Sequence, residues 1–201
     1  MSWKRFSFVL IVSLLASLSS AALTLPKEEM MALTAKWKGD RYPDGRPKVP
    51  DALLTRMKKV SLEEAWEVLK GEGYANQFAG DWKIIYPDKV MVGRALTAVY
   101  MPSRPDLAGR IMEIGKAEGR IGGSNSWPID MLQTGDVYVA DAFGKIADGT
   151  LIGDNLGNSI YAHSKNGVVF DGSVRDLEGL QEIDCKSHRS LRAGCRRPRP
   201  D

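Results

Sequence analysis

The sequence Gly153-Asp154-Asn155-Leu156-Gly157 is followed further along the chain by Gly172-Ser173-Val174-Arg175-Asp176. Twenty residues, 155–174, separate Asp154 from the Arg175-Asp176 pair. This interval would bring a glycine-flanked helix start, one cation and two carboxylates to one place. Such a site can hold a divalent metal ion and a small keto acid together, because carboxylates suit hard cations and helix starts suit anions.

The segments around these two stretches alternate between strand and helix patterns. Apolar, β-branched runs predict strands at residues 90–101, 136–140 and 168–170. Helix patterns lie at residues 106–118, 155–165 and 176–183. A capping box at Ser61 and Glu64 predicts the start of one more helix. Because strands and helices alternate, the sequence predicts an α/β fold.

The N-terminal end has the pattern of an export signal. A short positive region precedes a mostly apolar run, residues 6–18, and small residues follow it. The run is shorter than a typical membrane-spanning helix. We therefore predict a signal peptide over residues 1–22, cleaved after Ala21 or Ala22, and export to the periplasm or the medium. An uncleaved N-terminal membrane anchor is the alternative.

The rest of the chain divides into three predicted regions. These are an N-terminal arm or linker (residues 23–60), an α/β domain (residues 61–184) and a disordered basic tail (residues 185–201). The tail has few apolar residues and no periodicity, which is typical of disorder. Export would permit a disulfide between its two cysteines, Cys185 and Cys195. We interpret them instead as incidental thiols.

The charge distribution argues against a nucleic-acid partner. The net charge is only +3, and much of the positive excess lies in the tail. The body of the protein therefore has no basic face for a polyanion. We predict no nucleic-acid partner, and no membrane contact beyond the signal segment.

The residues around Asp154 allow two interpretations. In the functional one, the helix start binds a carboxylate, Arg175 contacts the same ligand, and Asp154 and Asp176 offer oxygen ligands to magnesium. In the local one, Asp154 caps the helix while Arg175 and Asp176 form a surface ion pair. The residues alone favour the local interpretation, because carboxylates at helix starts are common.

Further stretches of the sequence, in addition to the two quoted above, resemble a known family. Residues 92–97, 135–141, 153–156 and 172–176 resemble the family of the regulator of ribonuclease E activity A. That family also contains divalent-metal-dependent 4-hydroxy-4-methyl-2-oxoglutarate aldolases, which also decarboxylate oxaloacetate. The aldolase branch typically has an aspartate that is followed, after twenty residues, by an Arg-Asp pair, and this sequence has the same pattern. The resemblance covers about residues 61–183.

The resemblance implies a swivelling β/β/α domain that assembles as a trimer or a dimer of trimers, with sites between subunits. It implies that the amides of residues 153–156 (Gly153, Asp154, Asn155 and Leu156) bind the carboxylate of a pyruvoyl group. Arg175 would contact the substrate oxygen. Asp176 would bind the metal, and Asp154 would hold a metal-bound water.

The implied activity is that of a carbon–carbon lyase. It would cleave a pyruvoyl-containing acid, by aldol cleavage or decarboxylation, through a metal-stabilised enolate. Arg175 and Asp154 would be the catalytic residues, and Mg²⁺ the metal, with Mn²⁺ as the alternative. No lysine is needed to form a Schiff base.

Two features depart from the family pattern. After residue 183 the chain does not resemble the family, so it reads as C-terminally truncated and lacks the region that supplies a neighbouring subunit's acidic residue. Phe143 replaces a glycine often found after the central strand, which would narrow the pocket. Two alternatives to the lyase therefore stand: a non-catalytic protein-binding regulator, and an inactive truncated member.

Overall fold

The computed structural model describes residues 23–77, 79–80, 82–145, 150–187 and 193–196. The predicted signal peptide, residues 1–22, lies outside this part of the chain, so the structure does not bear on it. No helix within the described ranges combines the length and the apolar character that a membrane span requires.

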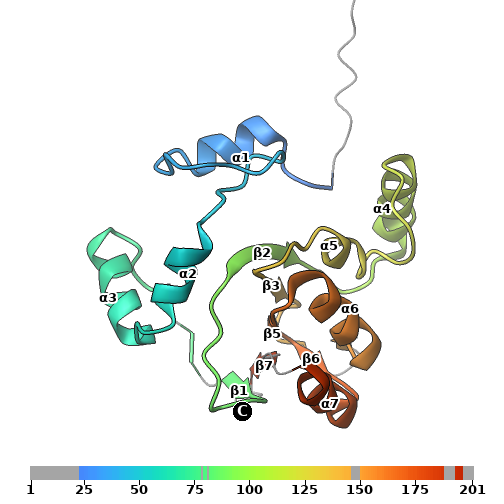
Figure 1. The fold of residues 1–201 in the computed structure, drawn as a ribbon. Helices are drawn as coiled ribbons and strands as arrows, with labels where there is room; N and C mark the ends of the chain where they lie inside the picture. Colours follow the sequence, from blue (N-terminus) through green and yellow to red (C-terminus); the bar gives the residue numbers. More distant parts are fainter. Residues whose placement is uncertain (1–22, 78, 81, 146–149, 188–192, 197–201) are drawn as a thin grey trace, which may run out of the picture.

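Helices and strands alternate through the second half of the chain (Figure 1). The helices are α1 (Lys27–Leu33), α2 (Asp51–Met57), α3 (Leu62–Gly71), α4 (Pro105–Ala117), α5 (Trp127–Asp130), α6 (Asp154–Ser164) and α7 (Leu177–Ser187). The strands are β1 (Trp82–Ile84), β2 (Arg94–Val99), β3 (Asp136–Asp141), β4 (Thr150–Ile152), β5 (Val168–Asp171), β6 (Ser173–Val174) and β7 (Ala193–Arg196).

The strands form two sheets. The larger has the order β1-β7-β5-β3-β2, in which β1 is antiparallel to β7 and the other neighbours are parallel. In the centre, Leu96 of β2 pairs with Tyr138 of β3, and Ala140 of β3 pairs with Phe170 of β5. The smaller sheet is the parallel pair β4 and β6. Parallel neighbours need crossover helices, which agrees with the predicted α/β class.

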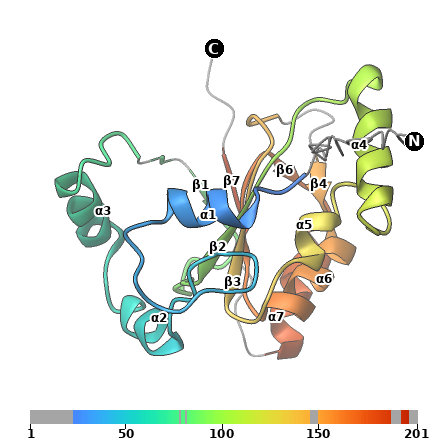
Figure 2. The ribbon, with the colours of Figure 1, turned by 90° about the horizontal axis from the view of Figure 1, so that it is seen from above.

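The core lies between the larger sheet and the C-terminal helices. Both ribbon views place α5, α6 and α7 on one side of this sheet and α2 and α3 on the other (Figures 1 and 2). Tyr138 and Phe170 of the central strands are fully buried together with Ile160 of α6 and Leu180 of α7. Burial on this side explains why β3 and β5 carry the strongest apolar strand patterns in the sequence.

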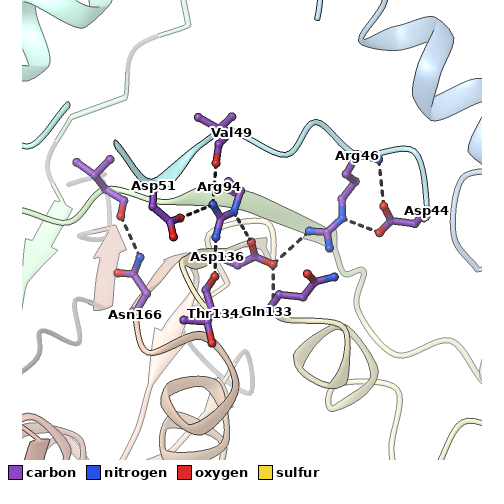
Figure 3. Close-up of polar contacts among 10 residues, drawn as sticks. Asp44, Arg46, Val49, Asp51, Arg94, Gln133, Thr134, Asp136 and Asn166 are labelled. Carbon is purple, nitrogen blue, oxygen red and sulfur yellow. Dashed lines mark hydrogen bonds and ion pairs between the residues drawn. The ribbon is translucent and has the colours of Figure 1, made fainter. Parts of the chain in front are cut away.

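A buried carboxylate lies at the start of β3. Asp136 is fully buried and accepts hydrogen bonds from Arg94 Nε (3.3 Å), Arg46 Nη1 (3.3 Å) and the Gln133 amide (3.0 Å) (Figure 3). The positive charges of the two guanidinium groups offset the free-energy cost of burying the Asp136 carboxylate. Arg46 comes from the segment between α1 and α2, so this contact ties the N-terminal segment to the sheet.

Arg94 extends the same polar cluster. Its Nη1 atom donates to the Val49 carbonyl (2.8 Å) and to Asp51 Oδ1 (3.0 Å), and its Nη2 atom donates to the Thr134 carbonyl (2.5 Å). Figure 3 shows the guanidinium lying between the N-terminal segment and the loop before β3. We call Asp136, Arg94 and Arg46 the Asp136 cluster. It is the main polar attachment of residues 44–51 to the domain.

A tyrosine pair joins β3 to the loop before α5. The hydroxyls of Tyr100 and Tyr138 lie 2.7 Å apart, and Tyr100 donates to the Asn125 carbonyl (3.3 Å). Burial raises the pKa of the Tyr138 hydroxyl, and the neighbouring Tyr100 adds to the effect. Both hydroxyls therefore stay neutral, as partners in a buried hydrogen bond require.

The predicted helices at residues 106–118 and 155–165 correspond to α4 and α6 with one-residue shifts at their ends, and the one at residues 176–183 corresponds to α7, which runs four residues further. The predicted strand at residues 90–101 is shorter, because only Arg94–Val99 pairs with β3. The capping box at Ser61 is present, with both of its hydrogen bonds formed. The apolar face of α3, however, buries none of its residues within the described chain.

The predicted tail differs from the structure. Helix α7 continues to Ser187, and residues 193–196 form strand β7 between β5 and β1. A short strand in the middle of a sheet is stabilised by its neighbours' hydrogen bonds rather than by its own apolar pattern. Disorder was therefore the wrong prediction for residues 193–196, while residues 188–192 and 197–201 lie outside the described chain.

Candidate functional site

The site begins where β4 passes into α6. Gly153 is the N-cap residue, and α6 starts at Asp154, one residue earlier than predicted. The Gly157 amide donates to the Gly153 carbonyl (2.9 Å), which closes the first turn. The amides before it have no intrahelical partner, as at every helix start. The Asp154 carboxylate binds one of these amides: its Oδ1 atom accepts a hydrogen bond from the Asn155 N–H group (2.6 Å).

The second half of the site follows β6. Ile152 of β4 pairs with Val174 of β6, and the Arg175 amide donates to the Ile152 carbonyl (3.1 Å). Because the two strands are parallel, their carboxyl ends lie at the same edge. This register places Gly153 directly beside Arg175 although they are far apart in the sequence.

Gly153 leaves space that Asp176 and Arg175 occupy. A Cβ atom at position 153 would lie 2.5 Å from Asp176 Oδ2 and 3.0 Å from Arg175 Nε. The absence of a side chain therefore allows the carboxylate and the guanidinium to approach the helix start. Asp176 has a left-handed backbone (φ 56°), which turns the chain between β6 and α7 and which Asp tolerates better than most residues.

Asp154 lies against the start of α7. A Cβ atom at Gly179 would lie 2.8 Å from Asp154 Cβ and 3.3 Å from Asp154 Oδ2. The structure thus brings together all the residues predicted for the site: Gly153, Asp154, Arg175 and Asp176 converge, and Asn155 and Leu156 form the first turn of α6 beside them. Their roles stay predictions.

Sequence reasoning missed Gly179. Its lack of a side chain admits Asp154 into contact with α7, just as Gly153 admits Asp176. A glycine near the start of a predicted helix is itself a signal of a close approach, because glycine weakens helices. The sequence contained this signal at position 179, although it does not say which residue approaches.

The local interpretation is correct in one part. Arg175 Nε and Asp176 Oδ2 do form an ion pair (3.4 Å), with the two side chains 73% and 47% exposed. Asp154 is not the N-cap, however, because Gly153 holds that position; Asp154 is the first residue of α6, and its carboxylate accepts from the Asn155 amide. Because the Arg175 side chain is mostly exposed and only its Nε atom forms this ion pair, a ligand could reach the guanidinium.

Two carboxylates at the site are candidate metal ligands. Asp176, beside Gly153, and Asp154, beside Gly179, lie at adjacent helix starts. Magnesium in proteins commonly uses one or two carboxylates and keeps several waters, so this pair is chemically compatible with Mg²⁺. Within the described residues, no group of three or more His, Cys, Asp or Glu side chains is placed to hold a metal. The metal therefore stays a prediction.

A family model described as RraA-like, Aldolase/RraA, matches residues 51–195. The chain belongs to the RraA-like family. The match includes the candidate site and continues past residue 183 into β7, where it ends at residue 195. The segment before residue 195 is therefore part of the family match, contrary to the expectation that resemblance ends at residue 183. The description joins aldolases with RraA, so RraA-like membership leaves the specific activity undetermined.

Several solved structures resemble the chain, among them the following three. RraAS2 of Streptomyces coelicolor, an unusual member of the RNase ES inhibitor RraA protein family, is 20% identical, with a TM-score of 0.49 over 74% of this chain and 64% of that one. An uncharacterized protein from Pseudomonas syringae pv. tomato is 19% identical, with a TM-score of 0.50 over 76% of this chain and 62% of that one.

The third structure is described as novel cellulases from microbes associated with the gut ecosystem. It is 14% identical, with a TM-score of 0.52 over 87% of this chain and 69% of that one. The chain spans less than two thirds of the length of the first two structures. At these identities the likeness concerns the fold alone. No curated protein matches the chain.

Proposed function

We propose that the protein is a divalent-metal-dependent lyase that cleaves a pyruvoyl-containing acid, by aldol cleavage, by decarboxylation of a compound such as oxaloacetate, or by both. The observation that carries the proposal is the approach of Arg175 and Asp176 to the α6 start across Gly153. This approach combines donors for a carboxylate, a fixed cation and metal-binding oxygens. Membership of the RraA-like family supports it.

The helix start and Arg175 would hold the substrate. The first amides of α6 and the positive end of its dipole favour the carboxylate of a pyruvoyl group. The Arg175 guanidinium can donate to the neighbouring keto oxygen, since its side chain is mostly exposed. The two contacts orient the bond that breaks relative to the carbonyl.

Cleavage requires stabilisation of negative charge. When the carbon–carbon bond breaks, its electron pair moves toward the carbonyl and yields an enolate. The other fragment leaves as CO₂ in decarboxylation or, in aldol cleavage, as a carbonyl compound whose hydroxyl has given its proton to a base or to water. The enolate oxygen would face Arg175. Donors that are already in place stabilise such a charge without reorganisation. A proton must then reach the carbon, and the Asp154 carboxylate at the start of α6 can hold or pass that proton through water.

Asp176 would hold the metal, and Asp154 would contact it through water. When bound, Mg²⁺ supplies further positive charge for the developing enolate, with Mn²⁺ as a substitute. Asp176 is suited to this role because its left-handed backbone directs it toward Gly153 rather than along α7.

The metal assignment is tested by pyruvate release from oxaloacetate in a magnesium titration. Asp176→Asn keeps the left-handed backbone but removes the charge. It is expected to raise the Mg²⁺ concentration for half-maximal activity by at least about 10-fold, since weakened ligand sets lose metal affinity on that scale. Asp106→Asn is the matched control, because Asp106 forms a surface ion pair with Arg104. If the activity persists after the metal is removed by a chelator, the proposed metal dependence is wrong.

Gly153→Ala tests the close approach itself. The new Cβ must displace the Asp176 carboxylate, which lies at the end of a movable side chain. Misplacement of a reacting group by about 1 Å can lower a rate by about 100-fold, so we expect a 10- to 100-fold loss of kcat/KM. Thermal stability should stay near that of wild type. Gly71→Ala is the control, because nothing lies within 4 Å of its Cβ position. Equal activity in the two variants contradicts the assignment.

We also propose that the chain is exported and acts as a trimer or hexamer. RraA-like membership supports the assembly. Apolar side chains of α3 that stay exposed, Leu62 and Val68 among them, also favour it, because monomers rarely leave such faces uncovered. The alternative is a protein-binding regulator without activity. A protein that binds and inhibits a ribonuclease, yet releases no pyruvate, would favour that alternative.

A further inference from the structure

Helices α6 and α7 touch at their first turns, where each has a glycine. Leu180 Cδ2 of α7 fills the space that Gly157 of α6 leaves open, and Ile183 Cδ1 lies 3.1 Å from the same Cβ position. In return, Asp154 of α6 fills the space at Gly179 of α7, with its Cβ atom 2.8 Å and its Oδ2 atom 3.3 Å from the Cβ position there. Each glycine therefore accommodates a side chain of the other helix.

The backbone of α7 is fixed from two directions. Leu180 is fully buried in the core beneath Gly157. On the next element, the Tyr86 hydroxyl lies 3.1 Å from the Leu180 carbonyl oxygen and 2.7 Å from that of Gln181, so it can donate to either. Because a close-packed interior resists movement, a side chain added at position 179 has to be accommodated mainly by Asp154.

The two oxygens of the Asp154 carboxylate have different surroundings. Oδ1 accepts from the Asn155 amide (2.6 Å), which ties it to the start of α6. Oδ2 lies against Gly179 instead, and no other residue in the described part of the chain donates a hydrogen bond to it. Oδ2 is therefore the oxygen left to hold or pass a proton through water, which is the role proposed for Asp154.

We propose that Gly179 is a positioning residue, which sets the place of Asp154 Oδ2 by leaving the start of α7 without a side chain. Ordinary contacts of a Cβ atom begin near 3.4 Å, so alanine at position 179 would force Asp154 and α7 apart by about 0.6 Å. Displacement of a reacting group by about 1 Å can lower a rate by about 100-fold. The inference rests on the proposed lyase, in which Asp154 handles the proton.

The first test is a double-mutant cycle on kcat for pyruvate release from oxaloacetate, at saturating substrate and Mg²⁺, so that weaker binding does not contribute. Asp154→Asn is expected to lower kcat by about 100-fold, the lower end for loss of a proton-transferring group. Gly179→Ala should lower it by about 10- to 50-fold. The double variant should be no slower than Asp154→Asn, because Gly179 acts through the carboxylate. Losses that multiply overturn the inference.

Two other glycines provide matched controls. Gly157→Ala disturbs the same helix contact but meets Leu180 rather than Asp154, so any loss of kcat that it causes should multiply with that of Asp154→Asn. Gly109→Ala adds a methyl group to α4, where nothing lies within 4 Å, and should keep the wild-type kcat. A wild-type chain that releases no pyruvate contradicts the proposed lyase instead, and the contact between Gly179 and Asp154 is then decided by unfolding.

Thermal unfolding tests this contact without any activity. In the wild type, Gly179→Ala is expected to lower Tm by at least about 3 °C, because the two Cβ atoms collide. In an Asp154→Gly background there is no Cβ atom to meet, so the same change should raise Tm by about 1–3 °C, since alanine favours helices over glycine. A lower Tm in the Asp154→Gly background overturns the inference, even if Gly179→Ala alone fails to fold.

Discussion

Replacing Arg175 by alanine is expected to lower kcat/KM for oxaloacetate decarboxylation by about 100- to 1,000-fold, the usual loss when one donor to a developing oxyanion is removed. The guanidinium lies beside Gly153 and is the only cation of the predicted triad. Its exposed side chain makes no buried contact that folding requires, so the variant should unfold at nearly the wild-type temperature.

Two further variants test whether the expected loss of kcat/KM is specific to the Arg175 guanidinium. Arg104→Ala removes another arginine that pairs with a nearby aspartate on the surface, and its activity should equal that of wild type. Arg175→Lys keeps the charge without the planar fork and should recover only part of the rate. If Arg175→Ala retains wild-type kcat/KM while its metal response is intact, the proposed role of Arg175 is wrong.

The largest loss of stability is expected from Asp136→Asn. Removing one partner from a buried ion pair typically costs about 3–5 kcal/mol, because a buried charge loses its compensation. Here Arg94, with a side chain that is 8% exposed, and Arg46, at 13%, would lose their shared buried partner. They would keep only the more exposed carboxylates of Asp51 and Asp44, so a loss near the lower end of this range is expected. The free energy of unfolding, obtained from urea titration of each variant, measures the effect.

Asp51→Ala is the control for this prediction. Asp51 also pairs with Arg94, but its carboxylate is 88% exposed, so its loss should change stability by at most about 1 kcal/mol. Because Arg46 lies in the N-terminal segment, Asp136→Asn should also make residues 44–51 more sensitive to proteases. Similar stability losses in the two variants would mean that burial is not what makes Asp136 important.

The candidate site could be predicted in outline because it depends on local signals. A glycine before a helix, a fixed interval and an Arg-Asp pair all lie within about 25 residues of sequence. The strands β3 and β5 could also be predicted from the sequence, since buried parallel strands have continuous apolar runs. The family resemblance then gave roles to residues that the pattern alone assigned to a helix cap and a surface pair.

Other parts depend on partners that the sequence does not name. Strand β7 is short, has no run of large apolar residues, and lies between β5 and β1. Strands β4 and β6 have three and two residues, too few for a periodic signal. The Asp136 cluster joins residues about 40 to 90 positions apart, and Asp136 reads in the sequence as an ordinary strand end.

The contact between Asp154 and Gly179 means that two helices begin at the same place. Each start contributes about half a positive elementary charge, so α6, α7 and the Arg175 cation together roughly balance the two carboxylates. An anionic acid that arrived alone would leave the site with an excess of negative charge, and a metal cation would offset it. In the proposed enzyme, metal and substrate should therefore bind cooperatively, with each tightening the other's dissociation constant by the same factor.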